Sequence, residues 1–323
     1  MAEIKAELVK QLRERTGVGM MECKKALVAT NGDLGEAEIY LRKQGLAKAG
    51  SKETRSTKQG LIGSYIAADQ KLGVLVEVNC ETDFVARTDE FQTMTLDIAR
   101  HIAQTKPSLV RLEDVTEAER VHLKQEQALY EQKFGADHAG TVGEFVKSKI
   151  AKLGENIGIS RFALFTVNGE GVVGQYVHMG AQIGVLLELT TKIAETSKKP
   201  EFETLVRDIA MQVAAASPHF VSKADVTADV LAKERDIAKA RVIAEGKPEK
   251  MADKIVEGRL AKFYEEVCLL EQPFIRENSI TVAELMKTIS GKLGDQIGVA
   301  RFVRYKVGDA GDAPNVAASP LPV

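Results

Sequence analysis

The sequence predicts an α+β protein with a three-helix N-terminal module and two homologous α+β subdomains with small antiparallel sheets, the second carrying a coiled-coil helical hairpin as an insertion. Two observations predict this class. Short β-branched runs alternate with stretches in which apolar residues recur every three or four positions. One unit of that pattern also occurs twice along the chain. A length of 323 residues is enough for two or three such domains.

Residues 1–47 are expected to form the three-helix module. Ile4, Leu8 and Leu12 recur at four-residue spacing and form one face of a first helix. A Gly-Val-Gly break separates this helix from a second one, and Asp33 can cap the third. Because about 45 residues build only a marginal core, the module is expected to need a partner surface.

Two stretches contain too little apolar surface to pack. Residues 48–59 are polar and basic, and are expected to be a linker, that is, a solvated tether. Residues 308–323 contain three prolines and are expected to be a disordered tail.

An internal repeat organises the rest of the chain. Residues 60–110 align without a gap to residues 171–221, at an offset of 111, with 16 identities in 51 positions. A second block at 153–162 matches residues 293–302 at an offset of 140. The chain therefore contains two copies of one unit, and the second copy has 29 residues inserted between the two blocks.

Each copy is expected to be one core subdomain, with residues 60–168 forming the first and residues 169–307 the second. Two β-branched runs around a short turn precede a helix, and a final strand closes the unit. The same helical spacing occurs in both copies, at Phe91, Met94, Ile98 and Ile102 in the first and at Phe202, Leu205, Ile209 and Val213 in the second.

The insertion, at about residues 225–270, is predicted to be a helical hairpin. If Lys233 is allowed at one seam position, apolar residues follow alternating four- and three-residue spacing before a Gly-Lys-Pro breaker at 246–248, and a similar seam resumes after it, which is typical of an antiparallel coiled coil. Ordinary helices packed on the domain are the alternative. The two predicted seams are Val226, Val230, Ile237, Ala240 and Ala244, and then Ala252, Val256, Leu260, Phe263, Val267 and Leu270.

Charge and cysteine content exclude several function classes. The chain has 44 Lys and Arg against 46 Asp and Glu, 5% aromatic residues and no Trp. Neither a direct nucleic-acid partner nor a membrane partner is therefore expected. Three cysteines lie far apart, as is typical of reduced thiols in a cytoplasm, and the charged N-terminus does not resemble a secretory signal. These features favour a cytoplasmic location.

No arrangement of residues points to catalysis. A GxGxxG pattern at 169–174 is followed by a strand-like run, so it is expected to form a hairpin turn rather than a phosphate-binding loop. Five scattered histidines and the missing hydrolase and metalloprotease motifs indicate no catalytic residue, no metal site and no cofactor. The protein is therefore not expected to be an enzyme.

The most informative segment is Glu77–Phe91, which passes from a strand into a helix. An acid beside an exposed Phe is costly unless a partner receives it, so Asp83 and Phe84 are candidates for binding. The alternative is that Asp83 caps the helix and Phe84 packs in the core. In the second copy Ala194 and Glu195 occupy these positions although the helix that follows is kept, which favours a function specific to the first copy.

The second copy has its own distinctive residues at the tip of its first hairpin. His178-Met179-Gly180-Ala181 stands where the first copy has Ala67-Ala68-Asp69-Gln70. An apolar tip that contains glycine is a plausible contact point, and an ordinary turn is the alternative.

Two long motifs resemble the translation elongation factor Ts family. They are LRERTGVGMMECKKAL at 12–27 and EVNCETDFV at 77–85. The resemblance runs from residue 2 to about residue 307, and it implies that the N-terminal module is similar to a ubiquitin-associated fold. It also implies a guanine-nucleotide exchange factor that binds elongation factor Tu in its GDP-bound and nucleotide-free states. Such a factor promotes GDP release by disturbing the Mg²⁺ and phosphate site.

The resemblance further implies which residues touch the partner. The segment that dislodges Mg²⁺ corresponds to Thr82, Asp83, Phe84 and Val85. The part that docks on the GTPase domain corresponds to Leu12, Arg13, Thr16, Gly17, Val18, Gly19 and Met20. The contact with the third domain of elongation factor Tu corresponds to His178, Met179 and Gly180. The coiled coil is a candidate for joining two such complexes into a dimer, whereas the proline-containing tail is a poor match to a further contact helix.

Two other functions compete with this interpretation. Residues 1–59 hold 12 Lys and Arg against 8 Asp and Glu, so the linker and the N-terminal module could bind RNA or the ribosome. An enzyme acting between the two copies is the second alternative, but it lacks a recognisable acid–base pair.

Overall fold

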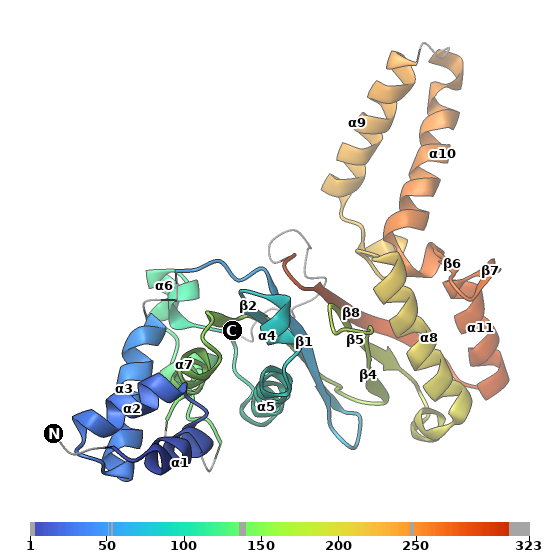
Figure 1. Ribbon diagram of the computed structural model, residues 1–323. Coiled ribbons are helices and arrows are strands. Elements are labelled where there is room, and N and C mark those ends of the chain that lie inside the picture. The colour runs from blue at the N-terminus through green and yellow to red at the C-terminus, as the bar shows by residue number, and fades with distance from the viewer. Residues whose placement is uncertain (1–3, 51, 53, 136–139, 246–248, 310–323) are drawn as a thin grey trace. The chain divides into compact units, whose positions relative to one another are not determined.

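The computed structural model describes residues 4–50, 52, 54–135, 140–245 and 249–309, and Figure 1 shows its helices and strands. The predicted α+β class is confirmed: helices pack on small sheets of three strands. The chain divides into two compact units, Met1–Gly63 with Val76–Phe162, and Ser64–Leu75 with Ala163–Val323. The predicted domain boundaries, which follow the repeat copies, stay predictions.

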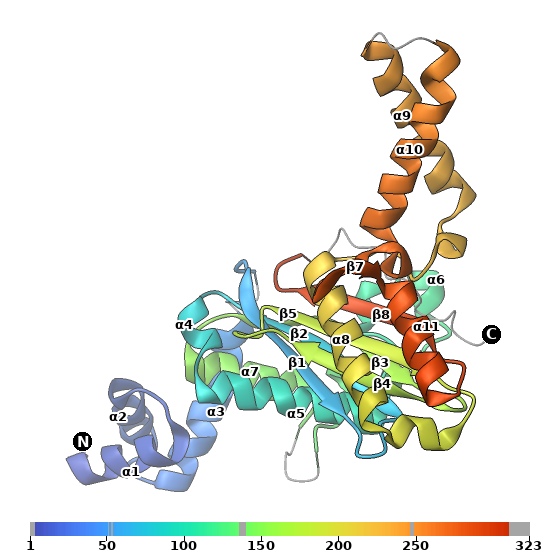
Figure 2. The same cartoon turned by 90° about the vertical axis from the view of Figure 1, so that its right-hand side faces the viewer.

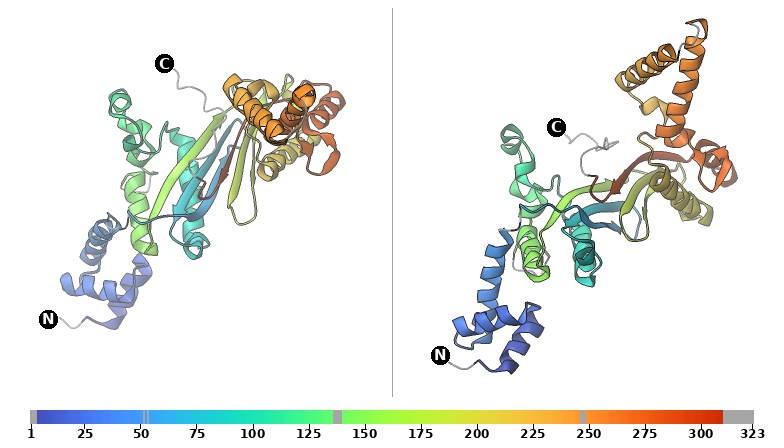
Figure 3. Two further views of the ribbon diagram at one scale, coloured as in Figure 1. Left: turned by 90° about the horizontal axis from the view of Figure 1, so that it is seen from above. Right: turned by 45° about the horizontal axis from the view of Figure 1, so that its top comes forward.

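Three helices form the N-terminal module: α1 (Ala6–Thr16), α2 (Met20–Ala29) and α3 (Leu34–Gly50). Figure 3 shows them grouped together. Gly17 ends α1 with a φ of 66°, a left-handed conformation that glycine adopts readily. Asp33 Oδ1 accepts the Glu36 N–H (2.9 Å) at the start of α3, as predicted for a cap. The small core consists of Val9, Leu12, Cys23, Ala26, Leu27 and Ala37.

The stretch predicted to be a solvated tether is bound to the first unit. Its first residues, 48–50, belong to helix α3. The Lys52 ammonium donates to the carbonyl of Gly154 (2.5 Å), and the Asn156 side-chain amide donates to the carbonyl of Arg55 (2.8 Å). Two residues of this stretch thus make contacts that composition alone does not indicate, while most of its described residues are exposed, and the linker itself stays a prediction.

The first sheet consists of β1 (Gln59–Ile66), β2 (Leu72–Cys80) and β3 (Ile157–Thr166), in that order. The helices of this copy are α4 (Asp83–Ala86), α5 (Asp89–Thr105), α6 (Glu117–Arg120) and α7 (Val142–Leu153), with short 3-10 turns η1 (Leu112–Asp114), η2 (Gln125–Gln127) and η3 (Leu129–Glu131). All four predicted face residues of α5 are fully buried, which confirms the helical spacing. A Cβ at Gly63 would lie 2.5 Å from Thr95 Cγ2, so β1 needs glycine where α5 approaches it.

The second sheet is antiparallel, in the order β4 (Gly171–Val177), β5 (Ile183–Thr190) and β8 (Gly298–Lys306). The helices of this copy include α8 (Pro200–Ala216) and α11 (Val282–Leu293), and two short strands, β6 (Pro273–Phe274) and β7 (Glu277–Thr281), pair with each other. Figure 2 shows α8 lying along β4 and β5, with its predicted face buried against them. Gly171 opens β4, so the GxGxxG pattern precedes a strand and no helix, as predicted. The expected hairpin turn was wrong, because the pattern leads from β3 into β4 and these two strands belong to different sheets.

The insertion forms two helices, α9 (Ala228–Ala244) and α10 (Glu249–Val267), which lie side by side in Figure 1. Their buried seam is Ala238, Val242, Val256 and Leu260. On α10 this matches the prediction, but on α9 the predicted seam was wrong. Its predicted residues Ile237, Ala240 and Ala244 are exposed, and the buried residues are Ala238 and Val242. The breaker at 246–248 and residues 310–323 of the predicted tail lie outside the described residues.

The same buried ion pair occurs in both copies. Arg161 Nε donates to Glu77 Oε2 (2.8 Å) in the first copy, and Arg301 Nε donates to Glu188 Oε2 (2.7 Å) in the second. The two glutamates align at an offset of 111 and the two arginines at 140. The Glu77 side chain has no exposed surface, so its charge depends on its partners within the protein.

A second ionic cluster stabilises the first unit near α7. Glu90 pairs with Lys149 and with Lys152, the latter at 2.8 Å. The hydrogen bond from Lys149, followed by that from Lys152, holds the pKa of Glu90 below its usual value of 4.5. A carboxylate with a lowered folded-state pKa stabilises the protein above pH 4.5, and this contribution is lost as the pH falls through the folded-state pKa.

Glu90→Gln is therefore expected to lower Tm by about 2–4 °C at pH 7, corresponding to about 1 kcal/mol. The gap to the wild type should narrow as the pH falls below 4.5, because Glu90 is then protonated first in the unfolded chain and, at still lower pH, in the folded protein as well. Thermal unfolding followed by circular dichroism between pH 3 and pH 7 measures this gap. The matched control is Glu201→Gln, whose exposed pair with Lys292 should contribute less. A gap that is constant with pH would contradict the ionic explanation.

Candidate partner-binding surface

The first candidate segment is a short turn between β2 and α5. Thr82 is the N-cap that precedes α4, and its Oγ1 accepts the N–H of Val85 (3.4 Å). Thr88 caps the next helix in the same way, with its Oγ1 accepting the N–H of Phe91 (3.3 Å). Because two caps lie six positions apart, α4 is limited to four residues and the chain turns sharply on entering α5.

Phe84 projects from this turn into solvent. Its side chain is 80% exposed, whereas Ala86 on the same turn is buried. Asp83 does not cap the helix, since its carboxylate pairs with Arg87 (2.8 Å) one turn later. The alternative in which Phe84 packs in the core and Asp83 caps is therefore wrong. A large apolar side chain held in water on a structured turn is a candidate contact for a partner.

The corresponding segment of the second copy has a different helix type and a charged residue in place of Phe84. It forms the 3-10 helix η4 (Ala194–Lys198), and Glu195, aligned with Phe84, pairs with Lys198 (2.8 Å) at the surface. No aromatic residue occurs at this point of the second copy, although α8 is packed as α5 is. The shared fold therefore does not require the aromatic side chain of the first copy.

A buried thiol forms a further hydrogen bond to this turn. Cys80 Sγ donates to the carbonyl of Thr82 (3.1 Å). Burial raises the pKa of Cys80 to about 12, so the thiol stays protonated and remains a donor at neutral pH.

The second candidate set lies where α1 passes into α2. Leu12 is fully buried and belongs to the core of the module, while Thr16 and Val18 are half-buried. Arg13, Gly17, Gly19 and Met20 are exposed. Met21, which was not among the predicted residues, is 67% exposed and continues the apolar surface of Met20. Adjacent flexible methionines are well suited to an adaptable contact.

The third candidate set lies at the hairpin between β4 and β5, in the second unit. Met179 is 90% exposed at its tip, and Gly180 has a φ of 81°. His178 Nδ1 and the Tyr176 hydroxyl share a hydrogen bond of 2.9 Å, which orients the imidazole. The first two sets thus belong to one unit and this tip to the other.

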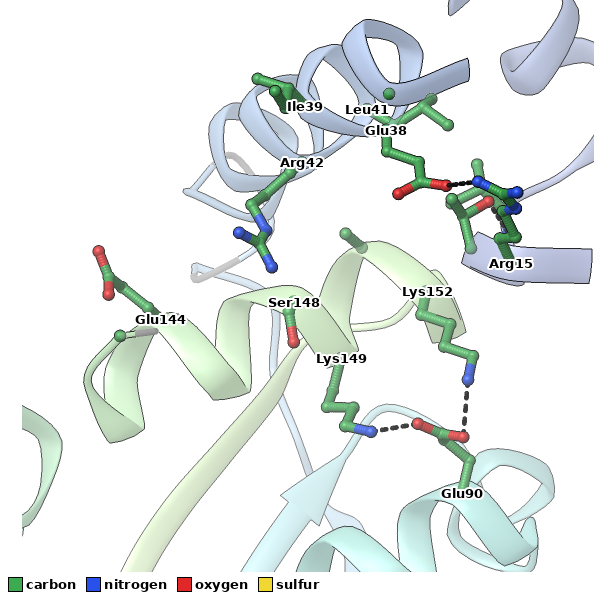
Figure 4. A pocket seen from close by; sticks show the side chains of 16 residues that line it. Arg15, Glu38, Ile39, Leu41, Arg42, Glu90, Glu144, Ser148, Lys149 and Lys152 are labelled. Atoms are coloured by element: carbon green, nitrogen blue, oxygen red, sulfur yellow. Dashed lines mark hydrogen bonds and ion pairs between the residues drawn. The ribbon is translucent and has the colours of Figure 1, made fainter. Parts of the chain in front are cut away.

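Sequence reasoning missed a cavity and a cluster of polar residues in the first unit. The cavity, of about 760 Å³, lies between the module and α7; Figure 4 shows Arg15, Glu38, Glu90 and Lys152 on its wall. Its acids and bases are largely paired with one another, as in the Arg15–Glu38 pair at 3.2 Å.

The polar cluster consists of Glu81, Thr82, Glu155 and Asn156. Glu155 and its repeat equivalent Asp295 are both acidic, and this was the signal available in the sequence.

The described residues contain neither a metal-binding cluster nor a membrane-spanning helix. Within that part of the chain, no three His, Cys, Asp or Glu side chains are grouped as a metal site would require. None of the helices described there combines the length and the apolar character needed to cross a membrane.

Comparison with known proteins assigns the class. The family model described as Elongation factor TS matches residues 81–309, which places the chain among the translation elongation factors. Elongation factor Ts of Solibacter usitatus is 44% identical over 310 residues, covering 96% of this chain and 94% of the relative. Those of Nostoc punctiforme and Symbiobacterium thermophilum are each 42% identical and cover 96% of this chain. The chain belongs to the elongation factor Ts family.

Proposed function

We propose that this protein is a guanine-nucleotide exchange factor for elongation factor Tu, which binds the GDP-bound form and promotes GDP release. One observation supports this most strongly. Phe84 is 80% exposed on a capped turn, whereas the second copy has a 3-10 helix without an aromatic residue at this point and still keeps the helix that follows. Exposing a Phe to water is unfavourable unless a partner receives it.

The proposed mechanism uses Phe84 as a wedge beside the nucleotide site of elongation factor Tu. In such a GTPase a bound Mg²⁺ ties the phosphates to the protein, so moving its ligands weakens nucleotide binding. An aromatic side chain inserted between packed elements can shift them from one arrangement to another. Asp83, which is ion-paired with Arg87 in the free protein, would compete for hydrogen-bond donors near the metal.

Two further surfaces are proposed to hold the partner while the wedge acts. The exposed methionines at the start of α2 would dock on the GTPase domain, with the α1–α2 corner around them. Met179, at the hairpin tip of the second unit, would contact the third domain. These contacts would supply affinity, and the Phe84 turn would supply the coupling to GDP.

The test is release of fluorescent GDP from purified elongation factor Tu, followed by stopped flow. The protein is expected to accelerate release, and coupling of this kind typically changes affinity about 5–150-fold. Because coupling is reciprocal, GDP must weaken binding of this protein to Tu by the same factor, which isothermal titration calorimetry can measure. Unchanged GDP release at saturating concentrations would overturn the proposal.

A further inference from the structure

The turn that presents Phe84 is held by residues from a distant part of the chain. The carboxylate of Glu155 accepts two hydrogen bonds from Thr82, one from its N–H (2.9 Å) and one from its hydroxyl (2.6 Å). The N–H of Asn156 in turn donates to Glu81 (2.6 Å). We call these four residues, Glu81, Thr82, Glu155 and Asn156, the clasp. It ties the end of β2 to the start of β3.

The N–H, the hydroxyl and the carbonyl of Thr82 all take part in hydrogen bonds. Its carbonyl accepts from the Cys80 thiol and from the N–H of Ala86 (3.3 Å), and its Oγ1 also accepts from Val85. Since Thr82 is the N-cap of α4, fixing it sets the direction in which the next two residues leave the turn. Phe84 itself is too exposed for core packing to hold it in place.

The linker is bound to the same cluster. Arg55 lies 3.4 Å from Glu81 through its guanidinium, and its carbonyl accepts from the buried Asn156 side chain. The chain that leads to the N-terminal module thus contributes two contacts to the clasp. Because Asn156 is buried, its polar groups depend on such hydrogen bonds, which favours a defined geometry over a fluctuating one.

The second copy provides an internal comparison. Asp295, aligned with Glu155, accepts from the N–H groups of Lys192 (3.0 Å) and Ile193 (3.2 Å), the residues aligned with Glu81 and Thr82. The carboxylate that holds the loop is therefore common to both copies. In the first copy the carboxylate also accepts from the hydroxyl of Thr82, the N-cap of α4, and the reciprocal Asn156–Glu81 bond is added. The second copy has Lys192 in place of Glu81, so it lacks the carboxylate acceptor of that reciprocal bond.

We propose that Glu155 is a positioning residue for nucleotide exchange, which acts by fixing the Thr82 turn in the conformation that presents Phe84. This inference rests on the exchange function proposed above. A preorganised wedge loses less conformational entropy when it inserts than one that must first be ordered. The effect of Glu155 on Phe84 is transmitted by the two hydrogen bonds that its carboxylate accepts from Thr82.

The test compares Glu155→Gln with Asp295→Asn, the matched change in the second copy. Amide hydrogen exchange of the free protein measures how firmly the Thr82 turn is held, without involving elongation factor Tu. In Glu155→Gln, the amides of Thr82 and Val85 should exchange about tenfold faster, because the N–H of Thr82 loses its charged acceptor. The maximal rate of GDP release should fall about tenfold, with a smaller change in the concentration needed for half-maximal effect. Asp295→Asn should change neither quantity.

Each other result has a definite meaning. Faster amide exchange with unchanged GDP release would show that Phe84 acts without a preset turn, and would overturn the inference. Equal loss of release in both variants would point to general destabilisation and would also overturn it. If Phe84→Ala, measured in parallel, releases GDP as fast as the wild type, the proposed role of Phe84 fails and the inference fails with it. The hydrogen-exchange result would still report whether Glu155 holds the turn.

Discussion

Phe84→Ala is expected to lower the acceleration of GDP release at least about tenfold while leaving the affinity for elongation factor Tu within about threefold of the wild type. The side chain is 80% exposed in the free protein, so its removal should change the free energy of unfolding by no more than about 0.5 kcal/mol. The loss therefore reports a contact made with the partner. Stopped-flow release of fluorescent GDP at several protein concentrations separates the maximal rate from binding.

Chelation of Mg²⁺ tests whether Phe84 acts through the metal. If the wedge acts by disturbing Mg²⁺, the difference between wild type and Phe84→Ala should largely disappear in excess EDTA, where the metal no longer holds the nucleotide. Met179→Ala is the matched control, since it also removes an exposed apolar side chain but lies in the other unit. It should weaken binding and leave the maximal rate unchanged. A Phe84 variant with wild-type maximal rates would show that release depends on docking alone.

Arg161→Met is expected to cost about 3–5 kcal/mol of stability. The Glu77 side chain has no exposed surface, and this substitution removes the guanidinium 2.8 Å from its carboxylate. The Asn79 side-chain amide still donates to Glu77 Oε1 (3.0 Å), but it is neutral and cannot compensate a buried charge. Urea unfolding at pH 7 measures the loss, and the amplitude of the transition shows whether the variant is folded at the start.

A double variant separates charge from packing. Glu77→Gln with Arg161→Met removes both charges and keeps the shape of the pair, so it should recover most of the lost stability. The equivalent changes at Arg301 and Glu188 test the same interaction in the second copy, where Glu188 retains 10% side-chain exposure and the cost should be smaller. A double variant as unstable as Arg161→Met would indicate that packing of the arginine, and not its charge, stabilises the sheet.

Much of the fold follows from local periodicity. The face of α5 from Phe91 to Ile102 and its repeat equivalent on α8 were predicted in full, because each residue's burial is set by a spacing that is visible within one helix. The α9 seam was wrong for the converse reason. Apolar residues occur on several sides of that helix, with Ile237 and Ile243 exposed beside buried Val242, so spacing alone does not fix which side packs on α10.

The candidate site, like the fold, could be predicted from the sequence only in part. Two long motifs were enough to predict the family, and the absence of Asp83 and Phe84 from the second copy pointed to these residues. Whether Phe84 lies in the core or in solvent could be seen only in the folded chain, since the capping threonines on either side of it are compatible with both positions. It also brought Glu155 to Thr82 across 73 positions and attached Arg55 to Glu81. Such contacts depend on how strands β2 and β3 are placed side by side, which no local pattern of residues encodes.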